Sequence, residues 1–405
     1  MAMLASATAG AVEYVPVFNA TLMGGQYFFQ AQKANLNGNA SVVFAPMMKT
    51  SERWSFIPMV ASSFQGTKGT ESGVGAGTLF QQQMDHRISF GAVHNPEGST
   101  WKFKPGLSYK REFMKETRDE TWGKGLFDYE KIGVGFEAEN IYKEPFSYRL
   151  GLDLFRIHFP NYQSLESKSG VDPNGNPLGR ELAGKNVLDT YNTQLSASIT
   201  MPYPYDEPKV SLSAGYSFLF QNYIDERLVD KRGALASAGR KDFQQSLNGS
   251  IGYPRPVKLF GKDVRLDSTV GVNVAMNSSN QNSFDAARAH YVEDSYSYYS
   301  YGIGPSFTFA WGDPKRPAWT GLSFRYNKTQ YFGRLAQDNA GLYTFERQFQ
   351  SRYVLGLSYG YPIAPGFSLK VQTNMLWIRS NNTFERNYSY NYRTTNYLMG
   401  FTYEY

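Results

Sequence analysis

The sequence predicts an all-β protein whose antiparallel strands form one closed, up-and-down barrel. The composition, a long alternation of apolar and polar residues, and connections that alternate between short and long all predict it. The 405 residues include 30 Tyr, 29 Phe and 38 Gly, and only 19% are charged. So many aromatic residues exclude a disordered chain. No apolar run reaches the roughly 18 residues of a membrane-spanning helix, so strands are expected throughout.

The alternation is clearest in 208–222. One face of this segment carries Val210, Leu212, Ala214, Tyr216, Phe218 and Phe220. The intervening residues are mostly Ser, Gly, Lys and Gln. Because successive side chains of a strand point to opposite faces, the segment has one apolar and one polar surface. Segments 99–113, 126–141, 261–276 and 344–361 repeat the pattern.

Extended along the chain, this pattern predicts sixteen strands. They are 26–35, 39–48, 53–63, 78–94, 99–113, 126–141, 146–159, 187–201, 208–222, 240–253, 261–276, 294–311, 317–331, 344–361, 366–379 and 390–405. The first three have the poorest alternation, and Asn37-Gly38 is the hairpin signal between the first two. The predicted organisation is an N-terminal segment 1–25 (a signal remnant, tag or periplasmic linker) and a barrel 26–405.

The connections differ in length at the two ends of the strands. Short turns rich in Pro, Gly and Asp are expected at 142–145, 202–207, 254–260, 312–316 and 361–365. Longer polar loops are expected at 114–125, 160–186, 223–239, 277–293, 332–343 and 380–389. This is the layout of a transmembrane barrel, and an even strand count puts both termini on the short-turn, periplasmic side. The sheet must close, because unpaired backbone groups in lipid cost several kcal/mol each.

Aromatic residues gather where the membrane interfaces are expected. Near the short turns these are Trp101, Tyr203, Tyr253, Trp311, Trp319, Tyr361 and Tyr405, and near the long loops Tyr331, Phe345, Trp377 and Tyr390. We interpret them as two aromatic girdles. The alternative is the general preference of strands for aromatic residues.

The last strand carries a specific resemblance. Tyr397, Phe401, Tyr403 and the terminal Tyr405 share one face with Met399. This pattern resembles the C-terminal assembly signal of bacterial outer-membrane β-barrel (porin-like) proteins, in which Phe is usual and Tyr less so. The resemblance implies localisation in the bacterial outer membrane, contact with outer-membrane lipid, and insertion by the outer-membrane assembly machinery.

The inward face of the predicted barrel holds more basic than acidic residues. The candidates for setting selectivity are Lys102, Lys104, Lys110, Arg149, Arg265, Arg325, Arg352, Lys370, Glu112, Glu137, Glu139, Asp153 and Asp267. Enclosed charges must be hydrated or paired. Either a water-filled lumen solvates them and they select solutes, with a slight preference for anions, or a plug and salt bridges between neighbouring strands neutralise them.

Other chemistry finds little support in the sequence. The chain has no Cys, which excludes disulfides and thiolate sites, and a net charge of +6 without a basic run does not predict nucleic-acid binding. The four His, none with a partner at a telling spacing, are His86, His94, His158 and His290. Residues 172–176 resemble a calcium loop, but Pro177 replaces its sixth-position Gly, so a flexible turn is favoured. No catalytic residue, metal or cofactor is predicted.

Three functions remain open at this stage. The first is an outer-membrane channel for passive diffusion or export of polar solutes or polymers. The second is a barrel that anchors or scaffolds a multiprotein cell-envelope complex with periplasmic or envelope partners. The third is an enzyme at the barrel rim that uses one of the His. Sixteen strands spaced about 4.8 Å apart and tilted about 40° give a diameter of roughly 32 Å, which favours the channel.

Overall fold

The computed structural model describes residues 12–30, 35–66, 74–75, 82–116, 119–141, 146–162, 186–202, 210–285, 288–385 and 388–405. Within these ranges sixteen strands form one wall. They are β2 (Phe18–Phe29), β3 (Asn35–Phe44), β5 (Trp54–Gln65), β7 (Gln82–His94), β8 (Trp101–Lys115), β9 (Tyr129–Ile141), β10 (Ser147–His158), β11 (Thr190–Pro202), β12 (Ser211–Val229), β13 (Leu235–Leu259), β14 (Lys262–Ser279), β17 (Tyr298–Asp313), β18 (Arg316–Gln337), β19 (Tyr343–Ala364), β20 (Phe367–Ser380) and β22 (Tyr392–Glu404). No described helix is long and apolar enough to cross a membrane.

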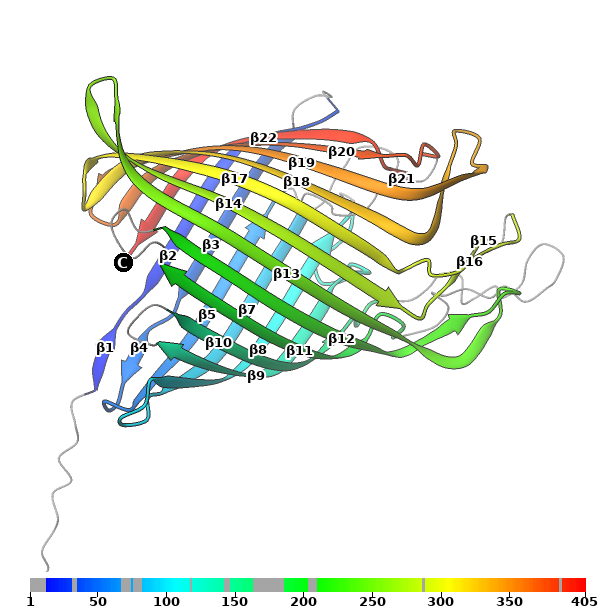
Figure 1. Cartoon of the computed structure of the whole chain (residues 1–405), viewed down its shortest axis with the longest axis horizontal. Helices are drawn as coiled ribbons and strands as arrows, with labels where there is room; N and C mark the ends of the chain where they lie inside the picture. Colours follow the sequence, from blue (N-terminus) through cyan, green and yellow to red (C-terminus); the bar gives the residue numbers. More distant parts are fainter. Residues whose placement is uncertain are drawn as a thin grey trace, which may run out of the picture.

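The wall is a closed antiparallel barrel, as the sequence predicts. Each strand pairs with its neighbours in chain order, and β22 returns to pair with β2, with Asn19 opposite Glu404. The start of β2 and the end of β22 therefore lie at the same end of the cylinder, on the side of the short turns (Figure 1). Two short strands, β1 (Glu13–Val15) and β4 (Met47–Lys49), extend the wall below β2 and β3.

Short strands outside the wall lie at the opposite end. The pair β15 (Ser283–Asp285) and β16 (His290–Val292) forms a hairpin in the connection between β14 and β17. The pair β6 (Val74–Gly75) and β21 (Tyr388–Ser389) joins two loops that are distant in sequence. The long connections therefore gather at one end of the barrel (Figure 1).

The prediction for the first hairpin was wrong. The structure begins the wall at Phe18, within the segment 1–25 that was expected to precede the barrel. Asn37 and Gly38 do not form a turn but lie inside β3, opposite Gly25 and Gly24. Pairing with β22 fixes the register of β2, and this closure overrides the local turn preference of an Asn-Gly pair.

Two predicted loops are strands. Segments 223–239 and 332–343 continue the β12–β13 and β18–β19 hairpins across β-bulges. Each hairpin ends in a turn in which an aspartate accepts two backbone N–H bonds, Asp230 at 2.8 Å and Asp338 at 2.9 Å. Each turn also has a glycine at positive φ, Gly233 at 77° and Gly341 at 79°. The shared Asp-x-x-Gly sequence is a turn signal, and it lies within segments whose alternation is too weak to predict strands.

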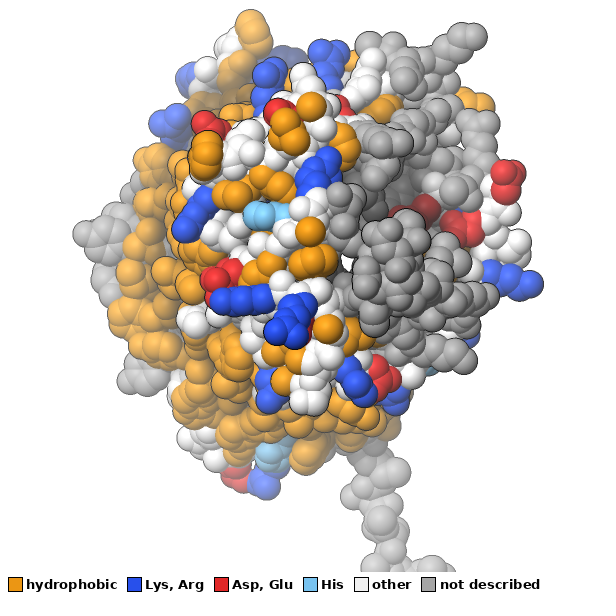
Figure 2. All heavy atoms as spheres, turned by 90° about the vertical axis from the view of Figure 1, so that its right-hand side faces the viewer, with side chains coloured by type: hydrophobic (Ala, Val, Ile, Leu, Met, Phe, Trp, Pro, Cys, Tyr) orange, Lys and Arg blue, Asp and Glu red, His pale blue; other side chains and the backbone are white. Residues whose placement is uncertain are grey.

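The two faces of the wall differ as the alternation predicts. Large apolar side chains stand exposed on the outside, including Leu22, Ile88, Leu107, Ile132, Val134, Leu150, Leu152, Leu195, Leu247, Val272, Val274, Ile303, Leu322, Leu357, Met399 and Phe401. Figure 2 shows apolar side chains covering the flank of the barrel and a mixture of charged and polar groups at the end facing the viewer. Such an exterior needs acyl chains around it, and the architecture is that of an outer-membrane barrel.

Two residues that were assigned to the aromatic girdles lie inside the barrel. Cross-strand register puts Trp319 and Tyr331 on the inward face, opposite Ala310 and Tyr298. Trp319 packs over Gly360, where any Cβ would collide with the indole ring. Tyr203 lies outside the described residues.

Candidate functional site

The candidate site is the inner wall of the barrel, because every predicted selectivity residue lies there. Side chains directly opposite each other on paired strands share a face. The register places Lys104 opposite Glu137 and Lys102 opposite Glu139, and it places Arg149 opposite Glu139 on the next pair. The wall divides into two sectors. We call β7–β10 the paired sector and β13–β19 the polar sector.

In the paired sector, charges neutralise one another across neighbouring strands. Lys104 Nζ lies 2.7 Å from Glu137 Oε1 and 2.6 Å from Glu139 Oε2. Arg149 Nη2 lies 2.9 Å from Glu139 Oε1. Cations and carboxylates thus alternate over three strands, as the salt-bridge interpretation predicts for these four residues.

A second ion-paired group lies further along the same strands. Lys110 Nζ is 2.6 Å from Asp85 Oδ2 and 2.7 Å from Glu112 Oε2, and it also donates to Tyr129 Oη at 2.7 Å. The Glu112 side chain is only 4% exposed, so removing its cationic partner would leave a buried charge uncompensated. The paired sector is therefore a fixed, largely neutralised wall rather than a free set of charges.

The remaining predicted charges differ in environment. Arg265 pairs with Asp267 two residues along its own strand at 2.9 Å, and both side chains are well exposed. Lys102, Asp153 and Lys370 face inward by register but make no ion pair within 4.0 Å in the described part of the chain. These three inward charges are therefore not neutralised by a described ion pair.

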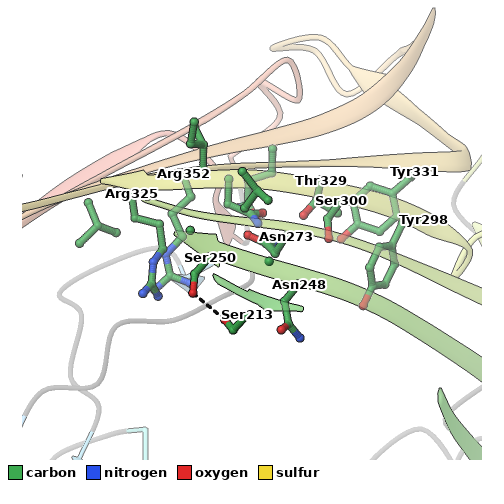
Figure 3. A pocket seen from close by; sticks show the side chains of 18 residues that line it. Ser213, Asn248, Ser250, Asn273, Tyr298, Ser300, Arg325, Thr329, Tyr331 and Arg352 are labelled. Atoms are coloured by element: carbon green, nitrogen blue, oxygen red, sulfur yellow. Dashed lines mark hydrogen bonds between the residues drawn. The ribbon is translucent and has the colours of Figure 1, made fainter. Parts of the chain in front are cut away.

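The polar sector contains a cavity of about 950 Å³ on the inner wall (Figure 3). Its lining includes the side chains of Ser213, Asn248, Ser250, Asn273, Tyr298, Ser300, Arg325, Asn327, Thr329, Tyr331, Gln350, Arg352 and Val354. The described residues that line it include two arginines and no carboxylate. Arg325 and Arg352 are thus the two predicted selectivity residues that the structure brings together in one cavity.

The sheet register positions the two arginines. Arg325 on β18 lies opposite Val354, and Arg352 on β19 lies opposite Asn327. The two are therefore diagonal neighbours on one face, a relation that spaces side chains about 7–8 Å apart at their bases. Figure 3 shows both guanidinium groups reaching in the same direction, toward Ser250.

Amides and hydroxyls form rows beside the arginines. Asn248 lies opposite Asn273, and Gly302 separates Asn273 from Asn327 across three strands. A Cβ at Gly302 would lie 2.6 Å from the Asn273 side-chain oxygen, so the glycine makes room for the neighbouring amide side chain. Next to it, the hydroxyls of Ser213 and Ser250 lie 2.7 Å apart.

An apolar cluster on the inward face was not predicted. Tyr27, Phe29, Leu376, Ile378 and Tyr392 pack together, each at most 7% exposed, and Val354 joins them to the cavity. The alternation of apolar and polar residues predicts an inward face of polar residues. In this part of β20 both faces are apolar, so periodicity alone does not reveal an interior cluster.

A buried ionic network lies at the long-loop end, past a register shift in β12. Arg240 bridges Glu226 at 3.1 Å and Asp242 at 2.6 Å, and its guanidinium lies between the rings of Tyr223 and Tyr296. Burial raises the pKa of the Glu226 carboxyl to about 7, although Arg240 acts in the opposite direction. We call these residues the mouth network. The mouth network was not predicted, because 223–239 was expected to be a loop.

Gln281 ties the mouth network to the connection after β14. Its amide nitrogen donates to Glu226 Oε1 at 3.1 Å and to the Arg227 carbonyl at 2.8 Å, while its oxygen accepts from the Val229 N–H at 3.0 Å. All three contacts are buried or nearly so. The network therefore anchors the β14–β17 connection to the tall β12–β13 hairpin.

The four His occupy different places. His86 Nδ1 lies 2.9 Å from the Ser62 hydroxyl, His94 packs on Trp54, and His290 packs on Tyr343. His158 has a partner that its sequence neighbours did not reveal, the buried Asp189, at 2.5 Å. Asp189 also accepts from the Phe159 N–H at 2.8 Å, which makes it a link between β10 and the start of β11.

No metal site emerges within the part of the chain that the structure describes. That part contains no group of three or more His, Asp or Glu placed to hold a metal ion. The calcium-loop candidate 172–176 lies outside the described residues.

Comparisons with solved structures find outer-membrane barrels over nearly the whole chain. OmpT of Vibrio cholerae (trimer form) is 10% identical, with 97% of this chain and 99% of that chain covered and a TM-score of 0.47. OccD3 (OpdP) of Pseudomonas aeruginosa is 10% identical, with coverages of 96% and 91% and a TM-score of 0.46. An anion-selective porin from Comamonas acidovorans is 9% identical, with coverages of 97% and 100% and a TM-score of 0.44.

Comparisons of the sequence alone find no match. No protein-family model matches the chain, and no curated protein matches it.

Proposed function

We propose that the protein is a channel of the bacterial outer membrane through which polar solutes diffuse. The observation that carries this proposal is the contrast between the two faces of one closed sheet. Outside, exposed Leu, Ile, Val and Phe side chains suit acyl chains. Inside, hydroxyls, amides and guanidinium groups border a cavity of about 950 Å³. A lining of this kind is stable only when hydrated or filled by polar solute.

The lumen is expected to favour anions modestly. Carboxylates in the paired sector neutralise most of its cations, whereas Arg325 in the polar-sector cavity makes no ion pair with a carboxylate of the described residues. Charged groups that line a pore set the sign of the ions that pass. The preference for anions therefore arises from the polar sector.

The last strand supports assembly in that membrane. Tyr397, Phe401 and Tyr403 point outward with 39–45% of their surfaces exposed, and Tyr405 is 72% exposed. An exposed row of aromatic residues at the closing strand fits the assembly signal that the sequence resembles. The proposal includes recognition of this row by the assembly machinery, outer-membrane lipid around the barrel, and termini on the periplasmic side.

Recording from planar bilayers tests the proposed channel. Purified protein is expected to insert and give discrete conductance steps, with a reversal potential in a KCl gradient that indicates preference for chloride. Arg325→Gln is expected to shift that potential toward zero, because a cavity charge is lost. A bilayer that stays sealed after verified insertion would contradict the channel and favour the alternative, an anchor or scaffold of a cell-envelope complex.

A further inference from the structure

We propose that the outer surface of the barrel binds an anionic phospholipid in a groove beneath the β13–β14 hairpin. This groove, which we call the hairpin groove, has a volume of about 400 Å³ and combines an apolar wall with the cation of Lys262. It lies at the short-turn end of the barrel, on the outside and apart from the lumen. The inference goes beyond the proposed channel and does not depend on conduction.

The β13–β14 hairpin projects past its neighbours and bends over the outer wall. The last described pair between β13 and β12 is at Gly252, whereas the pairing with β14 continues to Leu259. Figure 1 shows this hairpin, in green at the short-turn end, turning away from the line of the wall. Phe260 at its tip and Thr320 on β18 line the same groove, so the outer face of the hairpin turns back toward the wall.

The wall of the hairpin groove continues the apolar exterior. Leu266, Phe309 and Thr320 lie opposite one another in a row across β14, β17 and β18, on the outward face. Val264 and Leu266 are only 8% and 6% exposed, whereas Val272, further along the outward face of β14, is 50% exposed. The bent hairpin therefore shelters an apolar surface beside the lipid, and an acyl chain is the apolar group at hand to fill it.

Cations lie where the phosphate of such a lipid is expected. Lys262 and Arg316 are each four residues past the apolar row, toward the end of the barrel, and both are exposed. Four residues span about 13 Å and keep both side chains on the outward face. Trp311 lies between the two levels, as expected for an indole at the membrane interface. Asp313 lies opposite Arg316, so we assign the main phosphate contact to Lys262, which itself lines the groove.

The tip of the hairpin carries an exposed aromatic residue in an unfavourable backbone conformation. Phe260 and Gly261 form the turn, with φ of 50° and 78°. A turn with positive φ at both positions favours Asn-Gly or Asp-Gly, and a bulky residue rarely adopts such a φ. Phe260 is also 98% exposed, so packing within the chain does not account for it. Insertion among acyl chains next to the groove does, and it favours a lipid over a protein as the occupant.

Native mass spectrometry of the full chain, released from detergent micelles after titration with lipid, measures this binding. The probes are phosphatidylglycerol, phosphatidylcholine with the same acyl chains, and glycerol 3-phosphate, which has the phosphate without the chains. One molecule of phosphatidylglycerol is expected to be retained, about fivefold or more tightly than phosphatidylcholine, because only the former carries a net negative charge. Glycerol 3-phosphate is not expected to be retained. Equal retention of the two lipids, or retention of glycerol 3-phosphate, would overturn the proposal.

Three variants locate the lipid. Lys262→Gln is expected to weaken binding of phosphatidylglycerol about fivefold or more. Lys258→Gln is the matched control: it removes the same charge from the same hairpin, but Lys258 lies opposite Asp263 on the other face, and the affinity should equal that of the wild type. Phe260→Asn is expected to weaken binding while it supplies a residue type that the turn favours, so a disrupted hairpin would not account for the loss.

Each outcome decides for or against the hairpin groove. Weaker binding in Lys262→Gln and Phe260→Asn, with Lys258→Gln unchanged, would support it. Equal affinity of the two lysine variants, or an unchanged affinity in Phe260→Asn, would place the lipid elsewhere and overturn the assignment. Absence of any retained phosphatidylglycerol on the wild type would also overturn the proposal and favour a protein as the occupant.

Discussion

Gly400→Val is expected to abolish folding of the barrel. Gly400 lies on β22 at the seam where the sheet closes, opposite Met23 on β2. Any Cβ there would collide with the Leu22 carbonyl oxygen, and that backbone atom cannot move without breaking the ladder. Because an open edge is not tolerated in lipid, loss of this pairing affects the whole sheet.

Heat modifiability on SDS gels measures the folded fraction after refolding into detergent micelles. Gly24→Val is the matched control, since Gly24 lies on the other side of the same seam and a Cβ there meets nothing within 4 Å. The control should fold like the wild type, whereas Gly400→Val should run only as the unfolded band. Equal folding of the two variants would show that the seam is not as closely packed as described.

Arg240→Met is expected to loosen the β12–β13 hairpin severely. Glu226 is completely buried and Asp242 is 3% exposed, and both depend on the Arg240 guanidinium. Removing one partner of a buried ion pair costs about 3–5 kcal/mol, because the remaining charge is left uncompensated. At 1.4 kcal/mol for each factor of ten, amide protection near Val229 should fall by about a hundredfold or more.

Hydrogen exchange measured at two pH values tests whether the buried charge of Glu226 causes this loss of protection. Burial already raises the pKa of Glu226 to about 7, so the folded hairpin binds a proton more tightly than the unfolded chain does. The stability associated with that proton is fully present below the ordinary carboxyl pKa and is lost as the pH rises through about 7. The loss in Arg240→Met should therefore be larger at pH 8 than at pH 5.

Arg265→Met is the matched control for that experiment. Arg265 also pairs with an aspartate two residues along its strand, but its side chain is 69% exposed, so the expected loss is about 0–1 kcal/mol. Equal losses in the two variants would contradict the assignment of the mouth network as a buried anchor.

The alternation of side chains determined how much of the fold was predictable. Where one face of a strand meets lipid and the other meets water, as in β12 and β14, the period of two defines the strand and its orientation. Outside the lipid both faces are polar, and the pattern vanishes, which is why the upper parts of β12, β13, β18 and β19 were expected to be loops. At β2 and β3, pairing with β22 fixes the register. Because β22 lies far away in the sequence, no local pattern reveals that pairing.

The alternation predicts which charged side chains face the lumen, but it does not predict which of them pair with one another. Inward orientation follows from parity, and the register confirms it for Lys104, Glu137, Arg325 and Arg352. Which charges neutralise each other depends on how strands are offset, and no local sequence feature encodes that offset. The partnership of His158 with Asp189 is equally non-local, since the two residues lie 31 positions apart in the sequence.

Single-cysteine labelling in lipid vesicles tests the central claim most directly, because the native chain contains no Cys to interfere. Val272 and Asn273 are consecutive on β14; Val272 is 50% exposed on the apolar exterior, and Asn273 lines the cavity. Asn273→Cys is expected to react with a charged, water-soluble thiol reagent, and Val272→Cys is expected to be protected by lipid from that reagent. Equal reactivity of the two positions, or the reverse order, would contradict a barrel with an apolar exterior and a hydrated interior.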